Sequence, residues 1–351
     1  MRIGLVARAD CTGLAVQTYE FWRHMQPSKT LVITINGTSP PPHDMYPGAV
    51  AYQSPYPDLN PHPDGVIESF LDDLDLVFTC ETPYNYWLYQ RARERGVKTV
   101  QQFNFEYLDH VANPHIHKPD LFAAPSMWRW ADVPFPNKVY LPVPVARDRL
   151  PFRHRTELRT LLHVGGVPVT HDRNGTQRVI EAMRLLPDDV PVKLRLRTQS
   201  DVFVKERYRD RIEVVHEIVP DYWSLYGDED AMILPRKFGG LCLPFNEASS
   251  CGMPVLTTAV DPQVRFFPPP ALVPARRVGE FHVRNRINLY DAEPQELADR
   301  ITYLHRNPHV MAALSLAADR YADSISWERL KPVYEKTFER LCNGERLGVA
   351  A

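Results

Sequence analysis

The sequence predicts an α/β protein with two Rossmann-like, doubly wound domains. Short apolar runs alternate with amphipathic segments from residue 3 to residue 145, and the same alternation starts again at residue 161. Apolar runs without polar interruption are typical of strands buried on both faces, and strands separated by helices pair in parallel. The 351 residues also suffice for two domains, each with its own core. We place the first domain at residues 1–150 and the second at residues 151–326.

The first domain begins with a strand at residues 3–7, a turn that contains Gly13, and a helix at residues 14–25. A glycine in this turn lets the backbone approach a ligand, and the N-terminus of the following helix favours an anion. A plain structural turn explains the same glycine, and both interpretations stay open. The other expected elements of this half are strands at residues 29–35, 49–52, 74–79, 98–102 and 120–124 and a helix at residues 84–95, which Gly96 ends. The stretch 139–145 closes this half.

The second domain repeats this alternation after a polar connection at residues 147–159. Its helix at residues 293–304 has a proline in its first turn and apolar side chains on one face, as expected of a surface helix. The other expected elements are strands at residues 161–165, 192–198, 212–216, 231–234, 254–258 and 271–273 and helices at residues 175–186, 222–226 and 327–341.

Composition and charge exclude several classes of protein. The formal net charge of −2 gives no global field for non-specific binding to nucleic acid. The N-terminus lacks the apolar run of a signal peptide, and no segment approaches the ~20 apolar residues that span a bilayer, so we expect a soluble, cytoplasmic protein. The five cysteines have no paired metal-ligand spacing, and no Asp-x-Asp lies between apolar strand residues, so we expect no metal site.

The stretch 235–255 combines cations, glycines and one carboxylate directly after an expected strand. Arg236 and Lys237 precede the Gly239-Gly240 pair, and Glu247 lies in the short helix that follows. This order brings backbone amides and positive side chains to one place, which suits a sugar nucleotide. A solvated strand end is the alternative explanation for the two cations. For Glu247 the alternative is a carboxylate at a helix start that faces the helix dipole.

Several motifs of the second half resemble those of one known family. They are His163-Val-Gly-Gly, Arg173-Asn-Gly, Val179-Ile-Glu-Ala, Leu243-Pro, Glu247-Ala and Cys251-Gly-Met-Pro-Val. On these motifs the whole chain resembles retaining glycosyltransferases with the GT-B architecture, in particular the large family-4-like group. The variant is divergent and similar to some viral transferases, which would place the protein in the host cytoplasm.

The resemblance implies a fold and a reaction. The fold would be two Rossmann-like domains that face a central crevice, with the last helix, at about residues 327–342, packed back on the first domain. A nucleotide-diphosphate sugar, such as a UDP- or GDP-sugar, would bind the second domain, and Glu247 would accept hydrogen bonds from its ribose. The acceptor would bind the first domain, and transfer would retain the anomeric configuration without a metal or other cofactor.

Two positions depart from the family pattern. Gly239 stands where the first signature glutamate usually lies, and Gly166 replaces the arginine of the Val-Gly-Arg motif. Other groups must therefore meet the phosphate charge. The candidates are the side chains of Arg173, Arg236 and Lys237, with Arg173 and Lys237 in catalytic roles, and the backbone of Gly166, Gly239, Gly240 and Leu241 as further donor contacts.

Candidates for the acceptor side lie in the first domain. Relatives often carry a catalytic histidine late in this domain; the corresponding position here is Asn104, with Glu106 close by. Gly13 and Asp10 are further candidates, because they lie in the first loop, which faces the crevice in this architecture. A strand at residues 103–107 with packed aromatic side chains is the alternative explanation for this region, because Phe103, Phe105 and Tyr107 alternate.

Two other functions remain open: a nucleotide-sugar-binding protein that has lost catalysis, and an epimerase of nucleotide sugars, for which no acid–base pair is evident. The acceptor is also open, since a protein, a glycan, a lipid or a hydroxymethylated DNA base each fits the reaction class. A DNA acceptor predicts a basic face with affinity that falls as salt rises. Its candidates are Arg91, Arg93, Arg95 and Arg129.

Overall fold

The computed structural model describes residues 1–10, 12–35, 45–54, 58, 65–166, 171–199, 202, 204, 210–216 and 221–348. These residues form two compact units. Unit 1 comprises Met1–Val143, Val283–Asn285 and Trp327–Ala351, and unit 2 comprises Pro144–His282 and Arg286–Ser326. Each unit has its own apolar core.

Unit 1 is built on a seven-stranded parallel sheet in the order β3-β2-β1-β4-β5-β6-β7. The strand order reverses between the neighbouring strands β1 and β4. In open α/β sheets, ligands bind beyond the carboxyl ends of the strands at such a switch point. The strands are β1 Ile3–Arg8, β2 Lys29–Thr34, β3 Val50–Gln53, β4 Leu76–Cys80, β5 Lys98–Gln102, β6 Leu121–Ala124 and β7 Lys138–Tyr140.

The helices of unit 1 include one from the far end of the sequence. The ring of Phe21 on α1 stacks on Phe78 of β4 at 4.3 Å between centroids, and Tyr334 and Phe338 of α9 pack against the same two rings. The Tyr334 hydroxyl donates to the Pro142 carbonyl and is thereby satisfied inside the core. The helices are α1 Gly13–Met25, α2 Gly65–Leu71, α3 Trp87–Glu94, α4 Asp109–Ala112 and α9 Trp327–Cys342, with 3₁₀ turns η1 Phe105–Tyr107 and η2 Trp130–Asp132.

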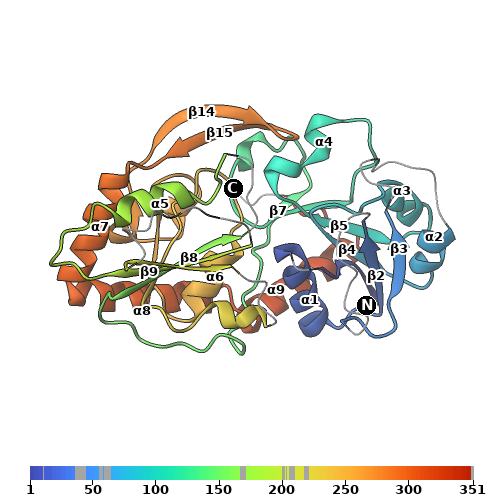
Figure 1. Cartoon of the computed structure of the whole chain (residues 1–351). Coiled ribbons are helices and arrows are strands. Elements are labelled where there is room, and N and C mark those ends of the chain that lie inside the picture. The colour runs from blue at the N-terminus through green and yellow to red at the C-terminus, as the bar shows by residue number, and fades with distance from the viewer. Residues whose placement is uncertain are drawn as a thin grey trace. The chain divides into compact units, whose positions relative to one another are not determined.

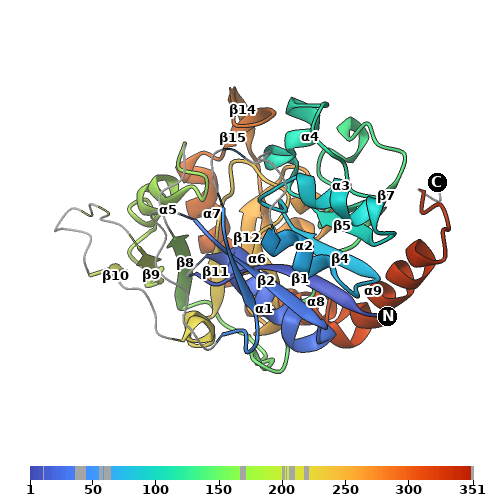
Figure 2. The same ribbon diagram turned by 90° about the vertical axis from the view of Figure 1, so that its right-hand side faces the viewer.

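Unit 2 is built on a six-stranded parallel sheet in the order β10-β9-β8-β11-β12-β13, and Figure 2 shows β10, β9, β8 and β11 in this succession. Here the switch point lies between β8 and β11, so the loops after these two strands are the expected ligand loops. The strands are β8 Thr160–Gly166, β9 Lys193–Thr198, β10 Ile212–His216, β11 Ala231–Ile233, β12 Val255–Thr258 and β13 Leu272–Val273.

A long antiparallel hairpin accompanies this sheet, formed by β14 Arg276–His282 and β15 Arg286–Asp291 (Figure 1). The hairpin is a separate two-stranded sheet, and residues 283–285 between its strands group with unit 1. The helices of unit 2 are α5 Thr176–Met183, α6 Leu243–Ser250, α7 Pro294–Arg306 and α8 Pro308–Ser324, with 3₁₀ turns η4 Tyr222–Leu225, η5 Gln263–Arg265 and η6 Pro269–Ala271.

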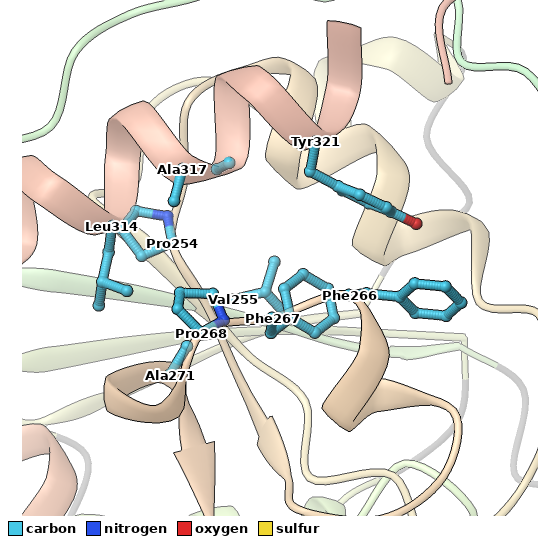
Figure 3. Close-up of a pocket in the computed structure, with 10 residues that line it drawn as sticks. Pro254, Val255, Phe266, Phe267, Pro268, Ala271, Leu314, Ala317 and Tyr321 are labelled. Carbon is cyan, nitrogen blue, oxygen red and sulfur yellow. The ribbon is translucent and has the colours of Figure 1, made fainter. Parts of the chain in front are cut away.

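A small apolar pocket lies where α8 packs over the end of β12 (Figure 3). Leu314, Ala317 and Tyr321 reach it from α8, and Phe266 and Phe267 reach it from the opposite loop. Its lining carries no ionisable side chain other than the Tyr321 phenol, whose hydroxyl donates to Asn246. We therefore regard the pocket as a packing feature of the core.

The predicted alternation of strands and helices is confirmed, with local corrections. The strand expected at residues 103–107 is wrong, because β5 ends at Gln102 and the chain then turns through η1. The stretch 139–145, which closes this half of the chain, overlaps β7 only as far as Tyr140, since Pro142 and Pro144 have no N–H to donate to a ladder. Among the elements that the sequence did not predict are α2, α4, α8 and the β14–β15 hairpin.

Candidate functional site

The loops after β8 and β11 meet at the switch point of unit 2. The backbone N–H of Lys237 donates to the Arg173 carbonyl at 2.9 Å. Gly175 has a positive φ of 70°, and a Cβ at this position would lie only 2.7 Å from the Pro235 carbonyl oxygen. Only glycine allows this close approach of the two backbones, so the Asn-Gly sequence before α5 fixes one loop against the other.

Arg173 and Arg236 converge on Gly239, which brings three of the predicted residues together. A Cβ on Gly239 would overlap an Nη2 atom of each guanidinium, that of Arg236 at 2.6 Å. Gly239 also has a φ of 108°, which a residue with a side chain adopts only under strain. A side chain at position 239 would therefore have to displace two guanidiniums, which fill the space that its Cβ would occupy.

The three cations are largely withdrawn from solvent. Arg236 is 6% exposed, and the Lys237 side chain is 12% exposed. The Arg173 guanidinium lies over the ring of Phe238 at 4.9 Å from its centroid, a cation–π contact. The alternative explanation of Arg236 and Lys237 as a solvated strand end is therefore wrong.

Two carboxylates lie near the Lys237 ammonium. Asp172 Oδ2 is 3.8 Å from Nζ and Asp291 Oδ1 is 3.5 Å from it. Asp172 also accepts hydrogen bonds from the backbone N–H groups of Thr176 and Gln177 at the start of α5. Asp291 accepts a hydrogen bond from Nε of Arg178 and forms an ion pair with its Nη2; the pKa of Arg178 is raised chiefly by the bond to Asp291.

Glu247 lies in the middle of α6 and is 3% exposed. It accepts hydrogen bonds from the hydroxyls of Tyr222, at 2.8 and 3.0 Å, and Tyr226. Burial raises the pKa of both tyrosines well above the ordinary value, and both remain donors. The alternative explanation as a helix-start carboxylate is wrong, because Glu247 is the fifth residue of its helix. The predicted ribose contact stays a prediction.

The remaining predicted donor residues have different surroundings. Gly166 ends β8 with a φ of 64° and open space at its Cβ position, and its carbonyl accepts from the Gln199 N–H at 3.1 Å. Gly240 and Leu241 are partly exposed and lie between Gly239 and the start of α6. Their predicted role as amide donors stays a prediction.

His163 lies beneath the loops, at the centre of β8. Its Nδ1 is 2.8 Å from the Ile233 carbonyl, so this nitrogen carries the proton, and Nε2 accepts from the Thr176 hydroxyl at 2.9 Å. Burial lowers the pKa of His163 to about 4. The neutral imidazole thereby links β11 to the first residue of α5.

In unit 1, Asp10 and Gly13 follow β1 at the switch point of the sheet. Asp10 pairs with the Arg8 guanidinium and accepts from the Thr12 N–H at 3.0 Å. Arg8 also donates to the Tyr84 hydroxyl at 3.0 Å, and Thr12 caps α1, which starts at the exposed Gly13. Asp10 therefore anchors this loop through an ion pair with a buried arginine.

Asn104 and Glu106 follow β5 but differ in their contacts. The Asn104 amide donates to the carboxylate of Glu81 at 3.1 Å, and Glu81 follows the neighbouring strand β4 with a φ of 67°. Glu106 is 1% exposed, and its carbonyl accepts from the Arg284 N–H at 3.3 Å. The structure thus pairs Asn104 with a carboxylate, while it buries Glu106.

Comparisons with known proteins bear on the fold. No family model matches the sequence, and no curated protein matches it. The structure is similar to sucrose-phosphate synthase from Thermosynechococcus elongatus, with a TM-score of 0.68 at 15% identity over 98% of this chain and 100% of that one. It is also similar to HepE of Anabaena in complex with UDP (TM-score 0.67, 12% identity, 97% and 100% covered) and to a glycosyltransferase from Rickettsia africae (0.66, 13%, 97% and 98%).

The chain has the GT-B fold. This finding confirms the predicted fold class, two Rossmann-like parallel α/β domains of the kind found in GT-B glycosyltransferases. Among the helices that the structure describes, none is long and apolar enough to cross a membrane. The described residues also contain no group of three or more His, Cys, Asp or Glu side chains that would hold a metal ion.

Sequence reasoning missed several residues near the cation cluster of unit 2, a name that we use for Arg173, Arg236 and Lys237. Phe238, Phe281 and Asp291 were not predicted to have a role, and neither was Glu81 in unit 1. Phe238 had a signal, because it separates the two cations from the glycine pair. Glu81 lies directly after β4, where polar side chains reach the ligand edge of a parallel sheet. Asp291 had no such signal, because it is the last residue of β15 in the antiparallel hairpin.

Proposed function

We propose that this GT-B chain is a glycosyltransferase that moves a sugar from a nucleoside-diphosphate donor to an acceptor with retention of configuration. The observation that carries the proposal is the convergence of the Arg173 and Arg236 guanidiniums on Gly239 at the switch point of unit 2, with Lys237 as the next residue after Arg236. Two guanidiniums held together, with a third cation in the same loop, suit the charge of a diphosphate. HepE, a structure with the same fold, binds UDP, which supports a uridine nucleotide as the first donor to test.

The chemistry follows from the charge. The bond between the anomeric carbon and the diphosphate oxygen breaks, and the acceptor oxygen forms the new bond while its proton passes to the leaving diphosphate. Negative charge grows on the diphosphate as the bond breaks, so fixed cations stabilise the transition state more than the ground state. We assign Arg173 and Lys237 to this leaving group, with Arg236 and the backbone of Gly166, Gly239, Gly240 and Leu241 as donor contacts. No step needs a metal.

We assign the acceptor to unit 1. Asn104, Asp10 and Gly13 belong to loops at the switch point of its sheet, and the Asn104–Glu81 pair offers a carboxylate and an amide to a hydroxyl group. Glu106 is a weaker candidate because it is buried. Donors bind unit 2 and acceptors unit 1 in this proposal.

A second function has one observation in its favour. Gly239 lacks the carboxylate that relatives carry, which fits a nucleotide-sugar-binding protein without catalysis. Turnover of the donor distinguishes the glycosyltransferase from the binding protein without catalysis. The purified protein is incubated with a panel of UDP- and GDP-sugars, with and without EDTA, and release of the nucleoside diphosphate is measured. Release that persists in EDTA supports the enzyme; tight binding without release across an acceptor panel contradicts it.

Acceptor identity needs a separate experiment. A hydroxymethylated DNA base finds no support in the proposed basic face, because Arg91 and Arg95 pair with Glu68 and Arg129 pairs with Asp132. Arg93 donates to the Lys118 carbonyl. Mass spectrometry of protein, glycan, lipid and DNA from cells with and without the gene identifies the acceptor class, and NMR of the product gives its anomeric configuration.

A further inference from the structure

The β14–β15 hairpin contacts the cation cluster of unit 2 at two separate points. At β15, the Tyr290 N–H donates to the Lys237 carbonyl at 3.0 Å, and the next residue, Asp291, faces the Lys237 ammonium. At β14, the ring of Phe281 packs against Phe238 with 4.8 Å between centroids. The hairpin therefore contacts Lys237 itself and Phe238, the residue whose ring lies beneath the Arg173 guanidinium.

The carboxylate of Asp291 is itself fixed. Nε and Nη2 of Arg178 both bind its Oδ2, at 2.9 and 2.8 Å, which leaves Oδ1 directed to Lys237. The Asp291 side chain is 11% exposed. An ion pair in such a place is screened less than one on the surface. The Lys237 ammonium, at the end of a flexible four-carbon chain, thus has a stationary partner.

The second contact acts through two aromatic rings. Phe281 meets Phe238 edge-on at an interplanar angle of 68°, a favoured geometry for aromatic pairs. The Arg173 guanidinium lies on the same Phe238 ring. A shift of Phe281 would therefore move the surface on which Arg173 lies.

We propose that the β14–β15 hairpin is a positioning element of the donor site: Asp291 holds Lys237, and Phe281 supports the ring beneath Arg173. The diphosphate as ligand rests on the proposed function, whereas the hold on the two cations does not. Asp291 and Phe281 are positioning residues, since they touch the cations or their support.

The sign of one affinity change separates positioning from simple charge. Asp291→Asn removes a negative charge beside an anion site, so electrostatics alone would tighten diphosphate binding. Positioning predicts the opposite, a Kd for UDP and for inorganic pyrophosphate about tenfold weaker, since small misplacements of binding groups cost up to ~100-fold. Titration calorimetry of the full chain measures both ligands. Unchanged or tighter binding by Asp291→Asn overturns the proposal.

Two more variants test the proposal in case Asp291→Asn does not fold. Circular dichroism monitors the folding of each variant. Asp291→Glu keeps the charge and displaces the carboxylate by one methylene, and Phe281→Leu disturbs the other contact; each should weaken pyrophosphate binding several-fold. Glu280→Gln is the matched control, because within the part of the chain that the structure describes this hairpin carboxylate pairs with exposed arginines of the hairpin itself, Arg277 and Arg286. It should bind like the wild type. Equal weakening in the control overturns the proposal.

A readout without any nucleotide keeps the inference separate from the proposed function. Mass spectrometry follows acetylation of Lys237 by an activated ester. Asp291→Asn should raise that rate about tenfold, because the ammonium loses the nearer of its two carboxylate partners and becomes more accessible to the ester. An unchanged rate overturns the hold on Lys237. If the wild type binds neither UDP, pyrophosphate nor any donor, the proposed function and the diphosphate role fall together, and the acetylation rate still decides whether the hairpin holds Lys237.

Discussion

The carboxyl ends of the two parallel sheets differ in charge, although their topology is alike. In unit 2, Arg173, Arg236 and Lys237 crowd the loops after β8 and β11. In unit 1, the corresponding loops carry an arginine that is already paired with Asp10, and the Asn104–Glu81 pair. The same architecture thus offers one edge suited to an anion and one suited to hydroxyl groups, which is the division that a diphosphate-sugar donor and an acceptor require.

The largest expected effect tests two arginines, one from each edge. Arg173→Ala should lower kcat/KM for donor turnover about 100- to 1000-fold, since loss of one preorganised donor to a developing charge costs about 3–4 kcal/mol. Arg8→Ala should leave the Kd for UDP unchanged, because Arg8 serves Asp10 and Tyr84. Calorimetry and a donor-hydrolysis assay measure both. Equal losses of UDP affinity in the two variants would erase the distinction between the edges.

Gly239→Ala is expected to weaken UDP binding about 10- to 100-fold, because the new methyl group displaces the guanidiniums of Arg173 and Arg236. Gly227→Ala is the control, since Gly227 has a φ of 129° with nothing within 4 Å of its Cβ position. It should share the backbone strain without the loss of affinity. Similar affinities for both variants would mean that the arginines do not bind the nucleotide.

A pH experiment compares the interiors of the two units. Burial lowers the pKa of His163 in unit 2 and of His110 in unit 1, each to about 4. The unfolded chain binds these protons more readily, so the stability that each neutral histidine contributes is present above pH 6.5 and is lost as pH falls toward 4. Each unit should lose about 2 kcal/mol between pH 7 and pH 5. Hydrogen exchange at β8 and α4 measures the two units separately.

The variant His163→Gln should flatten the pH dependence at β8 and leave that at α4 unchanged. Flattening at both places would show that the units unfold together and would remove this basis for treating them apart.

The smallest effect concerns the acceptor edge. Asn104→Ala removes the hydrogen bond to Glu81 and should slow transfer to the acceptor about three- to tenfold, in line with one lost hydrogen bond to a charged group, while UDP affinity stays the same. Gln90→Ala, which breaks an exposed amide–glutamate bond to Glu94, is the matched control and should change neither quantity. A drop in UDP affinity with Asn104→Ala would place the donor, and not the acceptor, at this edge.

Sequence could predict the fold because parallel strands are continuous apolar runs, and it could predict Arg173, Arg236 and Lys237 because cations followed by glycines at a strand end have a chemical meaning. It could not predict the β14–β15 hairpin. Most residues of β14 are exposed or partly exposed, so this strand shows no alternation of apolar and polar residues.

The sequence also could not predict which residues contact Glu247. Tyr222 and Tyr226 were predicted as part of a short helix, but nothing local places their hydroxyls on a carboxylate that lies 25 and 21 residues further along the chain, respectively. The reason for Gly239 is likewise a matter of space: the sequence shows that a side chain is missing there, and only the structure shows the guanidiniums that occupy its volume.

Lys237 separates two tasks within one residue. Its backbone N–H and carbonyl bridge the Arg173 loop to β15, and those bonds do not depend on the side chain. Exchange of the lysine for another unbranched residue should therefore leave the local scaffold standing while the charge alone changes. The folding of the two loops thus depends on the Lys237 backbone, whereas the proposed role in catalysis depends on its side chain alone.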